Sequence, residues 1–167
     1  MKYIRTFTDD YCVIDLETTG LSAATCDIIE IGILKIRSGK VVDTYCQLVH
    51  PSHPISSFIT HLTGIDNSMV AFSPTIETVL PSMLAFIGND LLVGHNMKFD
   101  LSFLLKHVSL TNAYSDTLHM AQKRFPQLSH HRLSDLQSYL HLSKNTHRSL
   151  ADCQTTYELY EYMKGMK

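Results

Sequence analysis

The stretch YCVIDLETTGL, residues 11–21, joins an apolar run to two carboxylates and a turn signal. The apolar run is typical of a strand buried in a sheet. Because side chains alternate along a strand, we expect Asp15 and Glu17 to point to the same face. Like charges beside an apolar strand repel each other and lose hydration, so one interpretation is a site for Mg²⁺ or Mn²⁺. The other is a strand that frays into a solvated acidic turn.

Composition limits the classes of protein. The 167 residues carry a formal net charge of -2 and are 44% hydrophobic and 18% charged, which favours one soluble globular domain over residues 1–167. A net charge of -2 excludes proteins that bind nucleic acid mainly through an overall positive charge. The four cysteines are scattered, which favours reduced thiols in the cytoplasm over a zinc site or disulfide framework. No apolar run reaches the length of a membrane span, so no membrane partner is predicted.

Hydrophobic periodicity predicts a mixed sheet flanked by helices. A turn at 38–40 joins the second and third strands into a hairpin. One helix is expected to begin at a capping Ser73 and to end near Ile87. The other expected strands and helices are strands 12–16, 28–36, 41–49, 91–93 and 113–116, and helices 100–107, 117–124, 133–140 and 149–163.

Two further stretches bear on the carboxylate pair. His95-Asn-Met-Lys-Phe-Asp100 follows a buried strand and opens a helix, and in a second stretch Asp152 follows His147 by five residues. The second spacing places Asp152 in the first turns of the last helix and His147 on the loop before it. Four acids from three segments, with one histidine on a mobile approach, are the parts of a two-metal phosphoryl-transfer site.

The motifs Asp15-x-Glu17-Thr-Thr-Gly-Leu, His95-Asn-x-x-Phe-Asp100 and His147-x-x-x-x-Asp152 resemble those of the DEDDh 3′–5′ exonucleases. Within that family the chain is similar to the epsilon proofreading subunit of bacterial DNA polymerase III and to the exonuclease domain of the Gram-positive replicative polymerase. The order and spacing of all three motifs carry the resemblance. It implies an α/β, ribonuclease-H-like fold with a central mixed five-stranded sheet flanked by α-helices.

The resemblance also implies roles for the motif residues. Asp15, Glu17 and Asp152 would ligate the first of two Mg²⁺ or Mn²⁺ ions, and Asp15 would bridge to the second. Asp100 would hold that second ion largely through water. His147 would be the general base, a task that suits a side chain whose pKa lies near working pH. Taken alone, His147 is one of ten histidines, and Asp100 equally fits an acid at a helix N-terminus.

The same resemblance implies a set of substrate-binding residues. The turn after the carboxylates would hold the terminal 3′ hydroxyl with backbone donors, and Leu21 would wedge beside the last base. His95 and Asn96 either brace the site or form a purely structural turn, and Phe99 faces either the terminal base or the core. The predicted substrate-binding residues are Thr18, Thr19, Gly20, Leu21, His95, Asn96 and Phe99.

The leading hypothesis is a metal-dependent exonuclease that releases nucleoside 5′-monophosphates from single-stranded DNA 3′ ends in proofreading or DNA repair. A DNA polymerase subunit is the expected partner. One alternative is a 3′–5′ exoribonuclease similar to oligoribonuclease or RNase T, because the motifs are shared between those branches. The other is a non-catalytic module that binds nucleic acid or a polymerase. The five motif residues are all present, which favours an enzyme, and residues 15–21 and 62–65 favour DNA.

Overall fold

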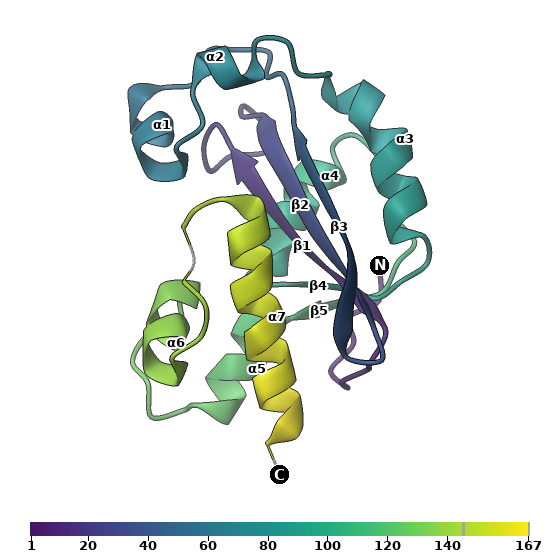
Figure 1. The fold of residues 1–167 in the computed structure, drawn as a ribbon, viewed down its shortest axis with the longest axis vertical. Coiled ribbons are helices and arrows are strands. Elements are labelled where there is room, and N and C mark those ends of the chain that lie inside the picture. Colours follow the sequence, from purple (N-terminus) through teal and green to yellow (C-terminus); the bar gives the residue numbers. More distant parts are fainter. Residues whose placement is uncertain (145, 167) are drawn as a thin grey trace.

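The protein is described by a computed structural model over residues 1–144 and 146–166. Five strands form one sheet in the order β3-β2-β1-β4-β5 (Figure 1). The first three strands are antiparallel neighbours, whereas β1, β4 and β5 are parallel. The predicted mixed five-stranded sheet is therefore confirmed. The strands are β1 (Tyr11–Thr18), β2 (Ile28–Arg37), β3 (Lys40–Leu48), β4 (Leu92–Gly94) and β5 (Tyr114–Asp116).

Helices cover both faces of the sheet. One core packs α3 and α4 against the face of β1 that carries Ile14, and a second packs α5, α6 and α7 against the face that carries Val13. Side-chain alternation therefore turns Asp15 and Glu17 toward the α7 face. No helix in the described ranges has the length and hydrophobicity needed to cross a bilayer. The helices are α1 (Ser57–Thr63), α2 (Asn67–Val70), α3 (Ile76–Ile87), α4 (Met97–Leu104), α5 (Thr117–Arg124), α6 (Leu133–Leu140) and α7 (Ser149–Gly165).

The start of α3 differs from the expectation. The predicted cap at Ser73 is wrong, because the N-cap residue of α3 is Thr75. The Ser73 N–H instead donates to the Val70 carbonyl at 3.1 Å, and the Pro74 carbonyl accepts the His50 N–H at 2.9 Å. Residues 73 and 74 therefore tie the chain back to α2 and to the end of β3, and the helix begins only after them.

The start of α4 also differs, and this difference matters for the acids. The expected helix began at Asp100, but α4 begins at Met97. The buried Asp116 carboxylate accepts the N–H groups of Asn96 and Met97 at 3.0 and 3.1 Å, which satisfies the first donors of the helix. Asp100 consequently lies in the first turn of α4.

The N-terminus of α7 approaches β2 at Gly32, which lies opposite Asp15 in the strand register. A Cβ atom on residue 32 would lie 2.5 Å from Ser149 Oγ and 2.6 Å from the Ser149 carbonyl carbon. Only glycine therefore lets the first turn of α7 lie this close to the sheet. The same approach brings Asp152 over β1.

We expect Gly32→Ala to destabilise the fold by about 1–3 kcal/mol, because the added methyl group displaces backbone as well as side chain. Gly165→Ala is the matched control, since nothing lies within 4 Å of a Cβ at that position. Urea unfolding of both variants measures the difference. Equal free energies of unfolding for the two variants would show that α7 does not depend on Gly32.

Candidate active site

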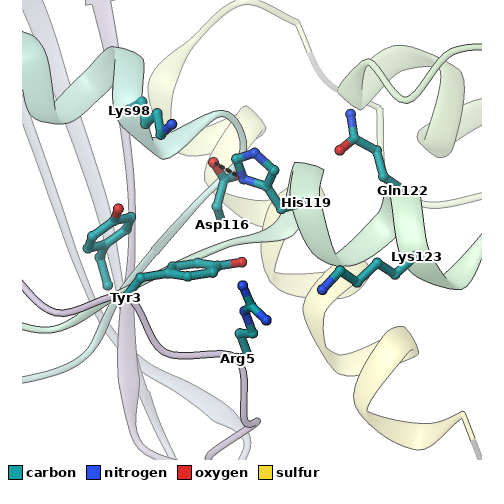
Figure 2. Close-up of a pocket in the computed structure, with 8 residues that line it drawn as sticks. Tyr3, Arg5, Lys98, Asp116, His119, Gln122 and Lys123 are labelled. Atoms are coloured by element: carbon teal, nitrogen blue, oxygen red, sulfur yellow. Dashed lines mark ion pairs between the residues drawn. The ribbon is translucent and has the colours of Figure 1, made fainter.

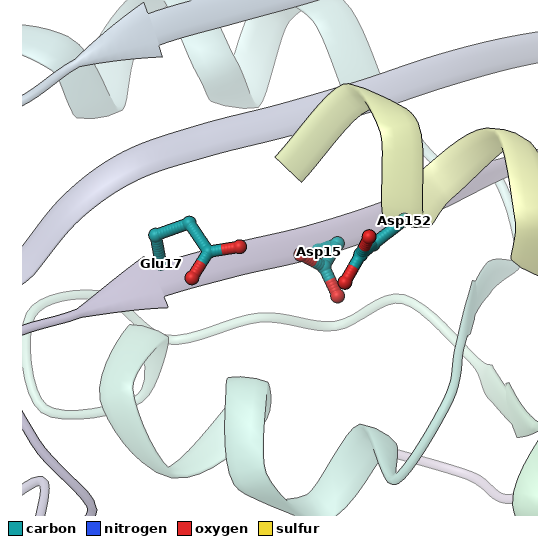
Figure 3. Close-up of side chains that lie close together, drawn as sticks. All are labelled: Asp15, Glu17 and Asp152. Atoms are coloured by element: carbon teal, nitrogen blue, oxygen red, sulfur yellow. The ribbon is translucent and has the colours of Figure 1, made fainter. Parts of the chain in front are cut away.

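Three carboxylates from two elements meet beside the C-terminal half of β1. Asp15 and Glu17 belong to β1, and Asp152 belongs to the first turn of α7 (Figure 3). One carboxylate oxygen from each residue lies within 4.8 Å of the other two. The arrangement follows from strand alternation and from the close docking of α7.

The electrostatics of this cluster are unfavourable without a cation. Burial, followed by the charges of Asp100 and Glu17, raises the Asp15 pKa well above its usual range. Burial and the charge of Asp152 raise the pKa of Glu17 to about 8. Burial likewise raises the pKa of Asp152. Hard oxygen donors that repel one another in a buried site fit a divalent ion such as Mg²⁺ or Mn²⁺.

Asp100 approaches the same strand from α4 but stands outside this group of three. Its side chain is 3% exposed, and Oδ1 accepts the backbone N–H of Leu16 at 3.0 Å. Burial raises the pKa of Asp100 to about 7. The hydrogen bond to Leu16 holds the fourth acid against the strand, beside Asp15.

The residue that anchors α7 is Glu30, which the sequence analysis missed. Its carboxylate is 1% exposed and lies opposite Glu17 in the register of β1 and β2. It accepts hydrogen bonds from Arg148 Nη2 at 2.6 Å, and from the backbone N–H and hydroxyl of Ser149 at 2.9 and 2.8 Å. Burial alone would raise the Glu30 pKa, but these donors outweigh it and lower the pKa. The sequence did contain a signal, because Glu30 is a single acid inside the apolar run IIEIGILKI. An acid buried in such a strand requires a buried partner.

His147 lies two residues before α7, and its side chain is exposed. Its backbone adopts the left-handed conformation, with φ 51°. The preceding residue, Thr146, donates its N–H to Asp152 Oδ1 at 3.0 Å. The segment that carries the histidine is therefore tied to one of the three clustered acids, while the imidazole itself remains open to solvent.

The turn after β1 is held by its own side chains. The Thr18 hydroxyl donates to the Gly20 carbonyl at 2.7 Å, and the Thr19 hydroxyl accepts the Asp27 N–H at 2.9 Å. A Cβ at Gly20 would lie 2.7 Å from Cys26 Sγ, so a larger residue would open the loop. Leu21 is 88% exposed. Of the four residues predicted to bind substrate in this turn, Leu21 is the one whose apolar side chain extends into solvent.

His95 is half-buried, and protein groups contact both of its ring nitrogens. Its Nδ1 lies 2.9 Å from the Thr117 hydroxyl and its Nε2 lies 2.9 Å from the His131 carbonyl. Burial lowers its pKa to about 4, so the ring is neutral at pH 7. Asn96 occupies the left-handed N-cap position of α4, with φ 66°. His95 therefore contacts α5 and the segment before α6, and the roles predicted for His95 and Asn96 stay predictions.

Phe99 is half-buried on α4, one residue before Asp100. Its ring centroid lies 5.1 Å from that of Phe103, which is fully buried in the core. Phe103 therefore packs inward, and Phe99 covers the edge of that core while retaining an accessible side.

Comparison with known proteins places this geometry in a family. The exonuclease family model, RNase_T, matches residues 12–160. The chain belongs to this exonuclease family. Two relatives named DNA polymerase III PolC-type come from Caldanaerobacter subterraneus subsp. tengcongensis and Clostridium perfringens. They are 43% identical over 157 residues and 38% identical over 170 residues, covering 90% and 98% of this chain. The chain spans only 11% and 12% of those relatives.

Solved structures agree with the family. Exonuclease X in complex with 5′ overhanging duplex DNA aligns with a TM-score of 0.79 and 28% identity, over 94% of both chains. The nuclease domain of 3′hExo, described as a DEDDh family member bound to rAMP, aligns with a TM-score of 0.79. It is 21% identical, over 96% of this chain and 94% of that one, so it supports the fold alone. The predicted resemblance to DEDDh exonucleases and the ribonuclease-H-like fold are confirmed, and the chain belongs to a family of nucleases, which are hydrolases.

We expect Glu17 to reduce the stability of the metal-free protein as the pH rises from about 4 to about 8. The folded Glu17 has a pKa of about 8, against an unfolded value near 4.3, so the folded state binds more protons in this window. Mn²⁺ binds deprotonated carboxylates, so it should raise the melting temperature more at about pH 8 than at about pH 5.

Thermal unfolding in EDTA and in Mn²⁺ at both pH values measures this effect. Asp15→Asn removes one repelling charge and one metal ligand. It should raise the melting temperature in EDTA and abolish the response to Mn²⁺. A wild-type melting temperature that ignores Mn²⁺ at both pH values would exclude a metal site among these acids.

Proposed function

We propose that the chain is a metal-dependent 3′–5′ exonuclease that acts on single-stranded DNA ends. The observation that carries the proposal is the cluster of Asp15, Glu17 and Asp152, whose oxygens lie within 4.8 Å of one another. The pKa of each carboxylate is raised, so the protein itself does not balance their charge. Residues 1–167 would act as one exonuclease unit.

The acids would share the work of holding two Mg²⁺ or Mn²⁺ ions. Asp15, Glu17 and Asp152 would hold one ion, Asp15 would also contact the second, and Asp100 would hold the second largely through water. Bound ions at such a site supply an activated water and stabilise the charge on the leaving oxygen. The hydrogen bond from Leu16 to Asp100 keeps that acid beside the strand before any ion binds.

His147 would take the proton from the attacking water. Its exposed side chain, on the segment tied to Asp152 through Thr146, can approach the cluster from solvent. A general base in this position takes up a proton, and imidazole is the side chain that most often has this role in enzymes.

The end of the strand would lie over the turn after β1. Thr18, Thr19 and Gly20 form a rigid turn whose backbone groups would hold the terminal 3′ hydroxyl, and Leu21 would wedge beside the last base. Phe99 would contact the terminal base from α4. His95 and Asn96 would act on the substrate indirectly, by bracing the start of α4.

The relatives favour DNA and a polymerase partner. Both are named as DNA polymerases, and this chain corresponds to about a tenth of their length. We propose that it serves proofreading in the cytoplasm and that a polymerase supplies processivity, because a chain of net charge -2 binds nucleic acid weakly by itself. An RNA substrate remains the second candidate, because the DEDDh member of the same fold is bound to rAMP.

The direct test uses single-stranded DNA and RNA of one sequence, each labelled at the 5′ end. With Mg²⁺ or Mn²⁺ we expect a ladder that shortens from the 3′ end, faster on DNA. EDTA and Asp15→Asn should each abolish it. Faster cleavage of RNA would assign the exoribonuclease function, and no shortening of either strand by folded, metal-loaded protein would support a binding module.

We expect His147→Ala to lower the rate of hydrolysis about 10²- to 10⁴-fold, the usual contribution of a general base. His130→Ala is the matched control, because it removes another exposed histidine. Both variants should retain the Mn²⁺-dependent rise in melting temperature. Near-normal turnover by His147→Ala would remove this residue from the mechanism.

A further inference from the structure

A second candidate site lies at the β5 edge of the sheet, apart from the clustered acids. A cavity of about 360 Å³ opens between the N-terminal segment, the start of α4 and α5 (Figure 2). Tyr3 lies beside Tyr114 as an added parallel bridge, so the N-terminal segment extends the sheet past β5. The cavity volume is within the range of about 300–1,000 Å³ that is typical of small-molecule sites.

The cavity collects positive charge in a chain whose net charge is negative. Arg5, Lys98 and Lys123 line it, and all three side chains are exposed. Within the described part of the chain, none of the three forms an ion pair. The acid that lines the cavity, Asp116, is 1% exposed and already accepts three backbone N–H groups. His119 Nδ1 also lies 3.2 Å from that carboxylate. The three cations are therefore free to bind an anion.

Aromatic rings form one side of the same cavity. The Tyr3 and Tyr114 ring centroids lie 5.3 Å apart, and the Arg5 guanidinium lies 5.7 Å from the Tyr3 centroid. Figure 2 shows Arg5 and Lys123 reaching into the cavity from the N-terminal segment and from α5. Flat rings beside unpaired cations match the two parts of a nucleotide, which stacks its base and pairs its phosphate.

We infer that this cavity binds a nucleotide unit, with its phosphate between Arg5 and Lys123 and its base against Tyr3. The assigned ligand is a nucleotide of the bound single strand, upstream of the 3′ end. A free nucleoside monophosphate shares this chemistry. The inference rests on the proposed function for the source of the nucleotide. The cavity also provides a local basic surface, which a chain of net charge -2 needs in order to bind nucleic acid.

The test compares Arg5→Ala/Lys123→Ala with Lys40→Ala/Lys106→Ala, which removes the same charge from exposed positions outside the cavity. Fluorescence anisotropy in EDTA measures the affinity for a single-stranded oligonucleotide over a salt series. Loss of the one phosphate contact should reduce the slope of log K against log salt concentration by about 0.7 in the cavity variant. The slope of the control should equal that of the wild type. Tyr3→Leu should weaken binding about fivefold or more, as loss of one base stack does.

A parallel titration with thymidine 5′-monophosphate distinguishes the two sources. If the cavity variant no longer binds the mononucleotide but keeps the wild-type salt slope for the strand, the cavity is a site for free nucleotide. Equal behaviour of the cavity and control variants toward both ligands would overturn the inference. Hydrolysis of the p-nitrophenyl ester of thymidine 5′-monophosphate by the wild type tests the catalytic proposal separately, because these binding measurements need neither metal nor turnover.

Discussion

The buried carboxylate of Glu30 determines where the last helix begins. It lies on β2, opposite Glu17, and binds Arg148 and Ser149 at the N-terminus of α7. A buried carboxylate without such donors would be costly, so the contact is strongly specified. With Gly32 leaving room for Ser149, this interaction brings Asp152 within reach of the two acids on β1. The clustered acids depend on it.

The fold therefore holds like charges together before any ion is present. Glu30 is neutralised by Arg148, whereas Asp15, Glu17 and Asp152 are not balanced, and the pKa of each is raised. Asp100 is fixed by the backbone of β1 from the opposite helix layer. A divalent ion would relieve the repulsion between these carboxylates, so its binding would increase stability. Unpaired cations are found elsewhere, at the β5 edge, where Arg5 and Lys123 line the cavity.

Much of the fold could be predicted from local pattern. Apolar and β-branched runs separated by turn signals located the three long strands. Of the four acids in the motifs, Asp15, Glu17 and Asp152 form the cluster. The boundaries that failed are those set by distant partners. The cap expected at Ser73 was lost because Pro74 binds His50, and α4 began early because Asp116, on another strand, accepts the N–H groups of Asn96 and Met97. Neither partner is visible from the neighbouring sequence.

The same division applies to the site. The sequence by itself determined that Asp15 and Glu17 share a face and that Asp152 lies early in the last helix, because both follow from the repeat of a strand or a helix. The tertiary structure alone decided that Glu30 anchors α7, that both ring nitrogens of His95 are occupied by protein, and that Tyr3 completes a basic cavity beside β5. These contacts join residues far apart in the chain, and burial rather than local spacing selects them.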